Sequence, residues 1–271
     1  MSSVIDAGKV HYNAKAVGFE AALRGLARDG FAVVDIATPR DIDVIRQAVR
    51  RVLARDDVVF RELGERTGTP QIQELHHIAS KAPEIMETDF FSRAKEFSQS
   101  FLKSSVHLKF DHVILKPAMS NRETGWHQDA AYTPRIWRFH NRVHWWLPLH
   151  DVPIEQGCMR YVPGTHHSSR MKHVAVGPTS DAIRTSLPEG SKVVDCPATA
   201  GSACVHLPKT LHSAGPNTTQ LPREAYILQF AARSLLPTLD FDDAGVTRWL
   251  SAKWQPEVRG TTSMTSGHMR R

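Results

Sequence analysis

The residues best placed to do chemistry are His127 and Asp129, which lie two positions apart in the run Gly125-Trp126-His127-Gln128-Asp129. In an extended strand, alternate side chains share a face, so His127 and Asp129 would reach one ion while Gln128 points away. A nitrogen from a distant strand would complete two imidazoles and one carboxylate on one face of a metal. That set, with open positions opposite, is typical of non-haem Fe(II) oxygenases. We expect His212 to supply the third ligand.

The surrounding sequence makes this pair more specific, because a His-x-Asp tripeptide arises easily by chance in a chain with 15 histidines. Trp126 precedes the pair, and Tyr132 and Pro134 follow it. Further motifs come in a fixed order: Val143-His144-Trp145-Trp146-Leu147-Pro148-Leu149, Gly157-Cys158-Met159, Val162-Pro163-Gly164-Thr165-His166, His212-Ser213-Ala214-Gly215-Pro216-Asn217, and Arg223. The series resembles the phytanoyl-CoA dioxygenase family of Fe(II)- and 2-oxoglutarate-dependent oxygenases over about residues 105–235, with a weaker similarity at residues 28–34.

The resemblance implies roles for several side chains. His127, Asp129 and His212 match the iron ligands of the family, and Arg223 matches the arginine that pairs with the far carboxylate of 2-oxoglutarate. Trp146 matches a family tryptophan beside the co-substrate, with Trp145 as the alternative if the alignment gap lies elsewhere. Ala214 is a departure, because some members have a hydroxyl there. The loop between Asp129 and Trp146 is also one residue longer than in a typical member.

Further candidates line the predicted cavity. His112 and Lys116 lie on a predicted strand and could face inward, and we assign His112 to the co-substrate site. Tyr132, Trp137 and Arg142 are predicted to line the mouth of the substrate pocket, with a solvated surface loop as the competing interpretation.

The resemblance also implies the reaction. The cofactors would be Fe(II), 2-oxoglutarate as co-substrate and O2, with 2-oxoglutarate decarboxylated to succinate and CO2. Related halogenases replace the carboxylate with a small residue, so Asp129 favours hydroxylation of an unactivated C–H, or desaturation or cyclisation. The expected substrate is a small molecule, such as an amino acid derivative, an acyl compound or a natural-product intermediate.

Two other function classes compete with this hypothesis. Zinc also accepts two imidazoles and a carboxylate, so a cupin-like hydrolase or isomerase would fit the same three ligands. Arg223 argues against it, because such an enzyme needs no anchor for an acidic co-substrate. A catalytically silent binding module that kept the fold is the third hypothesis.

The totals restrict partners and compartment. The net charge is +6 with a pI near 9.4, yet lysines and arginines are scattered among acids, which argues against nucleic-acid binding. Three cysteines, at positions 158, 196 and 204, form no Cys-x-x-Cys pair, so we expect reduced thiols. No secretory signal pattern and no run of about 18 apolar residues is seen, so we expect no membrane association and a cytoplasmic protein. The sequence predicts no particular oligomeric state.

The elements that must position the site follow from periodicity. Apolar spacing predicts helices over residues 16–29, ended by Gly30, from Pro39 onward with Thr38 as the cap, and over residues 81–103. Residues 56–73 lose this periodicity and suggest a lid or a solvated connection. The adjacent pair His76-His77 lacks a suitably spaced carboxylate and is not assigned to the site.

Short strands dominate from residue 105 onward. The predicted fold class is therefore mainly β, with a double-stranded β-helix (jelly roll, cupin-like) core over about 105–235, buttressed by N-terminal α-helices over about 16–103. We expect one domain spanning residues 1–271, with residues 236–271 as a C-terminal tail.

Overall fold

The computed structural model describes residues 10–56, 60–63, 71–132, 141–177 and 182–232. The chain divides into two compact units, Met1–Leu235 and Leu236–Arg271, and all of the described residues belong to the first. The prediction of one domain therefore stays a prediction, and the predicted C-terminal tail lies outside the described residues.

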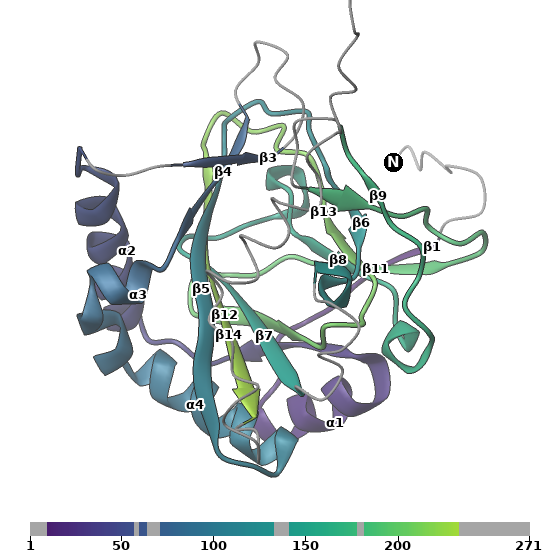
Figure 1. Cartoon of the computed structure of the whole chain (residues 1–271), viewed down its shortest axis with the longest axis horizontal. Helices are drawn as coiled ribbons and strands as arrows, with labels where there is room; N and C mark the ends of the chain where they lie inside the picture. Colours follow the sequence, from purple (N-terminus) through teal and green to yellow (C-terminus); the bar gives the residue numbers. More distant parts are fainter. Residues whose placement is uncertain (1–9, 57–59, 64–70, 133–140, 178–181, 233–271) are drawn as a thin grey trace, which may run out of the picture. The chain divides into compact units, whose positions relative to one another are not determined.

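Two sheets form the core, as the sequence predicted for a double-stranded β-helix (Figure 1). The smaller sheet has the strand order β1 (Val10–Asn13), β11 (Lys192–Cys196), β8 (Met159–Tyr161), β13 (His212–Ala214), β6 (Thr124–His127). The larger has the order β2 (Phe31–Asp35), β12 (Ser202–His206), β7 (Arg142–Pro148), β14 (Arg223–Ala232), β5 (Val106–Lys116), β4 (Ile72–His76), β3 (Arg61–Leu63). A separate hairpin joins β9 (Val174–Ala175) to β10 (Ile183–Arg184). Neighbouring strands in these sheets are antiparallel except for β1 and β11.

The N-terminal helices pack on the larger sheet, as predicted (Figure 1). They are α1 (Phe19–Asp29), α2 (Pro39–Leu53), α3 (Ile78–Lys81), the 3-10 helix η1 (Pro83–Glu87) and α4 (Asp89–Leu102). Shorter 3-10 turns are η2 (Asp129–Tyr132), η4 (Ile154–Gln156) and η5 (Thr165–His167). Gly30 ends α1 with φ 85°, and Thr38 and Asp41 form a capping box at the start of α2. Both helix ends were predicted correctly.

One predicted helix was wrong in its extent. The expected helix over residues 81–103 is interrupted at Thr88, whose hydroxyl accepts a hydrogen bond from the Phe91 amide and so starts a new helix. The predicted strand that carries His112 and Lys116 is β5, which pairs along its length with β14.

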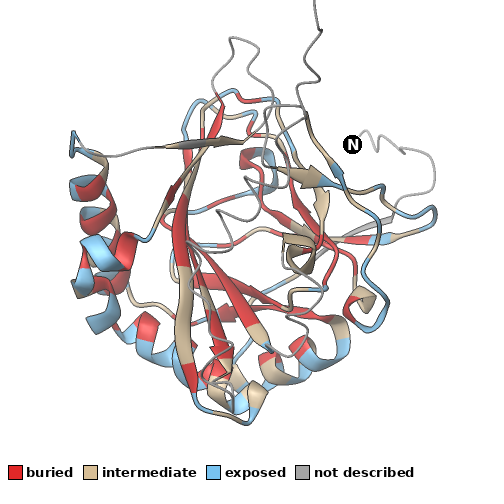
Figure 2. Ribbon diagram, viewed as in Figure 1, coloured by how far each residue is buried: buried red, intermediate tan, exposed pale blue. Residues whose placement is uncertain are grey.

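Alternation along β7 separates two apolar layers. Val143, Trp145 and Leu147 belong to the layer between the larger sheet and the helices. Trp146 belongs to the layer between the two sheets, with Tyr161 of the smaller sheet. Figure 2 shows buried residues concentrated on the strands and on the inner sides of the helices. The position of a side chain in the site therefore depends on the strand face that it occupies.

The predicted lid falls largely outside the described residues, since 57–59 and 64–70 are not described. Of the part that is described, Arg61–Leu63 forms β3, which pairs with β4 at the edge of the larger sheet. In the described part of the chain, no helix is long and apolar enough to cross a bilayer.

Candidate metal and co-substrate site

His127 and His212 come together on the smaller sheet. His127 ends β6 and lies directly opposite His212, the first residue of β13. Asp129 does not continue the strand as predicted, because it begins the 3-10 turn η2. The turn still returns its carboxylate to the two imidazoles. Gln128 points away from them, as expected, and is buried between the Lys209 carbonyl and the Met171 amide.

Backbone carbonyls fix the tautomers of both histidines. Nδ1 of His127 lies 2.8 Å from the Gly125 carbonyl oxygen, and Nδ1 of His212 lies 2.9 Å from that of Thr210. A carbonyl can only accept, so each Nδ1 donates its proton and each neutral ring keeps a lone pair on Nε2. Those nitrogens lie 3.5 Å and 3.6 Å from Oδ1 of Asp129. Metal-binding histidines typically have this second hydrogen bond.

These three atoms fit a metal ion. Two imidazole nitrogens and one carboxylate oxygen lie within 4.8 Å of one another and are largely buried. Three lone pairs that converge in a poorly solvated place favour a cation between them. The pair of imidazoles with one carboxylate is also the ligand set that non-haem Fe(II) prefers.

The pKa values agree with a site for one positive charge. Burial would raise the pKa of Asp129, but the neighbouring His212 and His144 hold it well below its usual range. Burial and the charge of His127 lower the pKa of His212 strongly. Burial also opposes a charge on His127, yet the Asp129 carboxylate raises the pKa of this imidazole. Asp129 is therefore held as a carboxylate and His212 as a neutral imidazole, the forms in which these side chains bind metals.

The other oxygen of Asp129 is held by two histidines that sequence reasoning missed. His144 Nδ1 lies 2.6 Å and His206 Nε2 lies 3.0 Å from Oδ2. Both come from the larger sheet, where His144 of β7 pairs with His206 of β12. A signal was available, because His144 lies two residues before Trp146 and therefore shares its inward face.

Arg223 lies beside Trp146. Its side chain is buried, and its guanidinium carbon is 5.6 Å from the centre of the Trp146 ring. One terminal nitrogen donates to the Gly157 carbonyl at 2.9 Å, while Nε has no partner among the described residues. Burial lowers the pKa of Arg223 to about 10, so the group stays charged near neutral pH.

Lys116 lies beside Arg223 on the neighbouring strand. The two residues are paired neighbours on β5 and β14, and both side chains are buried. The Lys116 amine donates to the Gly215 carbonyl. Burial, with the nearby Arg223 charge, lowers the pKa of Lys116 to about 6. Lys116 and Arg223 thus lie side by side, and within the described residues no carboxylate forms a hydrogen bond with either of them.

The remaining co-substrate candidates divide between the two faces of the larger sheet. Trp145, the alternative to Trp146, faces the helices and donates to the Ser98 hydroxyl at 3.1 Å. That orientation removes it from the site. His112 is buried on β5, paired with Ile227 of β14, and burial lowers its pKa to about 4. Its Nδ1 has no partner in the described part of the chain, so its role at the co-substrate site stays a prediction.

Two of the three residues predicted to line the mouth of the substrate pocket, Tyr132 and Arg142, lie in the described part of the chain. The Tyr132 ring centre lies 6.2 Å from that of His127, and the Tyr132 hydroxyl accepts from the Ile183 amide. Arg142 begins β7, two residues before His144. Trp137 lies outside the described residues.

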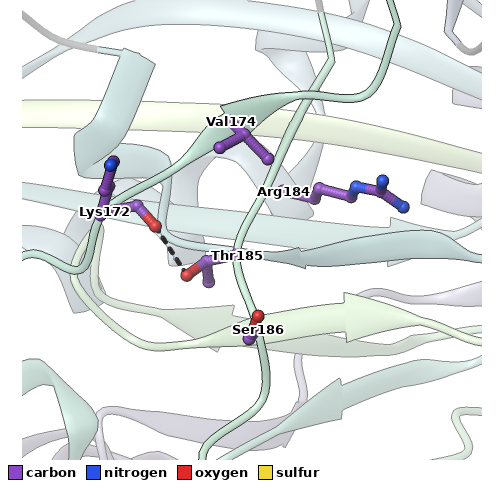
Figure 3. Close-up of a pocket in the computed structure, with 5 residues that line it drawn as sticks. All are labelled: Lys172, Val174, Arg184, Thr185 and Ser186. Carbon is purple, nitrogen blue, oxygen red and sulfur yellow. Dashed lines mark hydrogen bonds between the residues drawn. The ribbon is translucent and has the colours of Figure 1, made fainter.

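A surface pocket of about 540 Å³ lies near the β9–β10 hairpin (Figure 3). Its lining residues are Lys172, Val174, Arg184, Thr185 and Ser186, none of which is a predicted site residue. The Thr185 amide donates to the Trp126 carbonyl, so this pocket borders the strand that ends at His127. The cysteines, also outside the site, are buried free thiols at positions 158, 196 and 204.

The fold is a jelly roll, and two histidines and one carboxylate converge in it as a candidate metal site. Residues 26–225 match the phytanoyl-CoA dioxygenase (PhyH) family, which covers well over half of the chain. The chain belongs to this family.

Individual relatives agree with this membership. A probable alpha-ketoglutarate-dependent hypophosphite dioxygenase from Stutzerimonas stutzeri is 26% identical over 153 residues, which are 54% of this chain and 52% of that protein. The crystal structure of EvdO2 from Micromonospora carbonacea var. aurantiaca complexed with 2-oxoglutarate has a TM-score of 0.69 and 25% identity, covering 84% of this chain and 98% of that one. The epimerase SnoN from nogalamycin biosynthesis, at 23% identity and a TM-score of 0.60 over 79% of this chain and 83% of that one, shares the fold. The chain spans about half the length of the curated relatives it matches.

Proposed function

We propose that this protein is an Fe(II)- and 2-oxoglutarate-dependent dioxygenase that oxidises a small molecule. The observation that carries the proposal is the convergence of His127 Nε2, Asp129 Oδ1 and His212 Nε2, with the buried guanidinium of Arg223 on the larger sheet. Together they offer a cation site and a site for an acid. Membership of the PhyH family and similarity to a 2-oxoglutarate complex support the same interpretation.

The side chains would each have a distinct role. His127, Asp129 and His212 would hold the metal, which when bound supplies the redox chemistry. Three ligands on one side of an ion would leave its other side open to the co-substrate and O2. The planar fork of Arg223 suits the far carboxylate of 2-oxoglutarate, and the inward face of Trp146 would border it.

The type of reaction follows from the carboxylate. Related halogenases have a small residue where this chain has Asp129, so we propose hydroxylation of a C–H bond as the outcome. The hypophosphite dioxygenase relative and the 2-oxoglutarate complex both support an oxidation driven by 2-oxoglutarate. Small-molecule substrates fit a site that lies between two sheets. We propose His112 as a further co-substrate contact, and Tyr132 and Arg142 as substrate contacts from η2 and the start of β7.

The experiment measures succinate release and O2 consumption after addition of Fe(II) and 2-oxoglutarate to the purified protein. We expect succinate to form in step with O2 uptake even without the natural substrate, at a low rate that stops when Zn(II) replaces Fe(II). His127→Ala is the matched control and should abolish the reaction. Absence of succinate from a protein that binds both Fe(II) and 2-oxoglutarate would contradict the proposal. Zinc-supported hydrolysis without O2 would favour the cupin-like alternative.

A further inference from the structure

The two oxygens of Asp129 have different surroundings. Oδ1 faces the Nε2 atoms of His127 and His212, which carry no proton in their neutral tautomers. Oδ2 faces Nδ1 of His144 at 2.6 Å and Nε2 of His206 at 3.0 Å. One oxygen is therefore turned toward the metal ligands and the other toward hydrogen-bond donors.

The tautomers of the second histidine pair are also determined. A carboxylate oxygen can only accept, so His144 carries its proton on Nδ1 and His206 carries a proton on Nε2. His206 Nδ1 lies 3.2 Å from the Tyr161 hydroxyl, and a lone pair on this nitrogen lets it accept from that hydroxyl. A chain of hydrogen bonds thus runs from Tyr161 through His206 to Asp129.

Two donors saturate Oδ2. Each oxygen of a carboxylate has about two lone-pair sites, and both sites of Oδ2 are used by His144 and His206. Only Oδ1 then remains to bind a metal. A carboxylate with one free oxygen binds through that oxygen alone and occupies a single coordination position.

The arrangement links the two sheets. The imidazoles that face Oδ1 come from β6 and β13 of the smaller sheet, while His144 and His206 come from β7 and β12 of the larger one. Asp129 itself begins a short 3-10 turn, which by itself holds a side chain less firmly than a strand ladder does. The larger sheet therefore supplies the contacts that fix its orientation.

We propose that His144 and His206 are positioning residues that hold Asp129 in single-oxygen coordination. The inference rests on the proposed metal site. A carboxylate that bound through both oxygens would take two coordination positions. By holding Oδ2, the two histidines would keep one of these positions open. Because the partners of metal ligands typically contribute 10- to 100-fold to metal affinity, we expect about that loss when both donors are removed.

The test uses Co(II), whose visible absorption reports coordination number and whose binding is followed by calorimetry. The double variant His144→Leu/His206→Leu removes both donors. We expect about 10- to 100-fold weaker binding and an altered Co(II) spectrum. His144→Asn and His206→Gln place an amide N–H near the lost ring nitrogens and should restore most of the affinity and the original spectrum. His166→Gln is the matched control, since buried His166 bonds only the Ala27 carbonyl in the described structure; it should leave both readouts unchanged.

Tyr161→Phe keeps the inference testable if the leucine variants fail to fold. It removes only the donor to His206 and should weaken Co(II) binding by a smaller factor while changing the spectrum in the same direction. Co(II) affinity and spectra that match the wild type in the folded variants would overturn the inference. So would a crystal structure with Co(II) bound to His144 and His206. His127→Ala separates the two proposals: if it too binds Co(II) normally, the metal site itself is wrong.

Discussion

The two ends of the proposed site differ in charge and in how their side chains are held. At the metal end, each ligand side chain is oriented by another group: the Gly125 carbonyl for His127, the Thr210 carbonyl for His212, and two imidazoles for Asp129. At the co-substrate end, Lys116 and Arg223 face each other on paired strands with no carboxylate in contact among the described residues. Arg223 keeps its charge near neutral pH, whereas burial and the nearby Arg223 charge lower the pKa of Lys116 to about 6, so an anion bound here would be paired with Arg223 first.

In the proposed function a single molecule would bind at both ends. 2-Oxoglutarate has one carboxylate and a keto oxygen that suit a metal, and a second carboxylate that suits Arg223. Variants that alter one end at a time test whether the two ends have separate roles.

Removing a metal ligand should have the largest effect. We expect His127→Ala and His212→Ala each to weaken Fe(II) binding by more than the roughly 100-fold seen at most for outer partners of a metal. Anaerobic titration with Fe(II) measures this. Thermal unfolding provides the control, because both variants should melt near the wild-type temperature. Wild-type Fe(II) affinity in either variant would contradict the assigned metal end.

The adjacent tryptophans test the boundary of the co-substrate end. Trp145 packs against Phe90 and Phe97 on the helix side, so Trp145→Ala should destabilise the fold by about 3–5 kcal/mol. Urea unfolding measures this. Trp146→Ala should instead raise the 2-oxoglutarate requirement several-fold, because the ring lies beside Arg223. The milder variants Trp145→Phe and Trp146→Phe test which tryptophan lies at the co-substrate end. A change in 2-oxoglutarate binding in Trp145→Phe but not in Trp146→Phe would contradict the assignment of the two faces.

Replacing the anchor should weaken the co-substrate end alone. Arg223→Lys keeps a positive charge but loses the planar fork, so we expect about a tenfold or greater rise in the 2-oxoglutarate requirement, equivalent to one charged hydrogen bond. Succinate formation across a range of 2-oxoglutarate concentrations measures it. Fe(II) affinity should stay unchanged as the internal control. An unchanged 2-oxoglutarate requirement would refute the role of Arg223.

Lys116 gives the smallest effect and a pH dependence. In the unfolded chain the amine has its ordinary pKa of 10.5, whereas burial lowers its folded pKa to about 6. Between these values the unfolded chain binds more protons, so this group makes the protein more stable as pH rises. Lys116→Met removes that contribution. The free energy of unfolding of the variant, minus that of the wild type, should therefore be largest near pH 6 and should fall as the pH rises toward 10.

Urea unfolding of both proteins at several pH values gives the difference in the free energy of unfolding, and the prediction concerns the slope of this difference with pH rather than its absolute size. The absolute size also contains the lost hydrogen bond to Gly215. A difference that does not change between pH 6 and pH 9 would show that Lys116 stays charged in the folded protein.

Sequence reasoning predicted much of this arrangement because it depends on local patterns. The helix cap at Thr38 follows from short-range chemistry. The family resemblance favoured Trp146 and left Trp145 as the alternative, and strand alternation places the two on opposite faces. The approach of His212 to His127 was predicted through resemblance to a family and is seen in the pairing of β13 with β6.

The rest depends on strand register, which the sequence does not encode locally. His144 and His206 are separated by 61 intervening residues and meet because β7 and β12 pair in one particular register. The same holds for Lys116 and Arg223 on β5 and β14. Asp129 was placed on a strand, but the strand ends at His127 because the chain turns into η2.

The most direct test of the account is the affinity for 2-oxoglutarate with and without Fe(II), measured by anaerobic calorimetry. If one molecule bridges the two ends, Fe(II) must strengthen 2-oxoglutarate binding, and 2-oxoglutarate must strengthen Fe(II) binding by the same factor. We predict a strengthening of about tenfold or more in the wild type, within the usual range for coupled sites, and none in His127→Ala. Equal 2-oxoglutarate affinity in the presence and absence of Fe(II) would contradict the account.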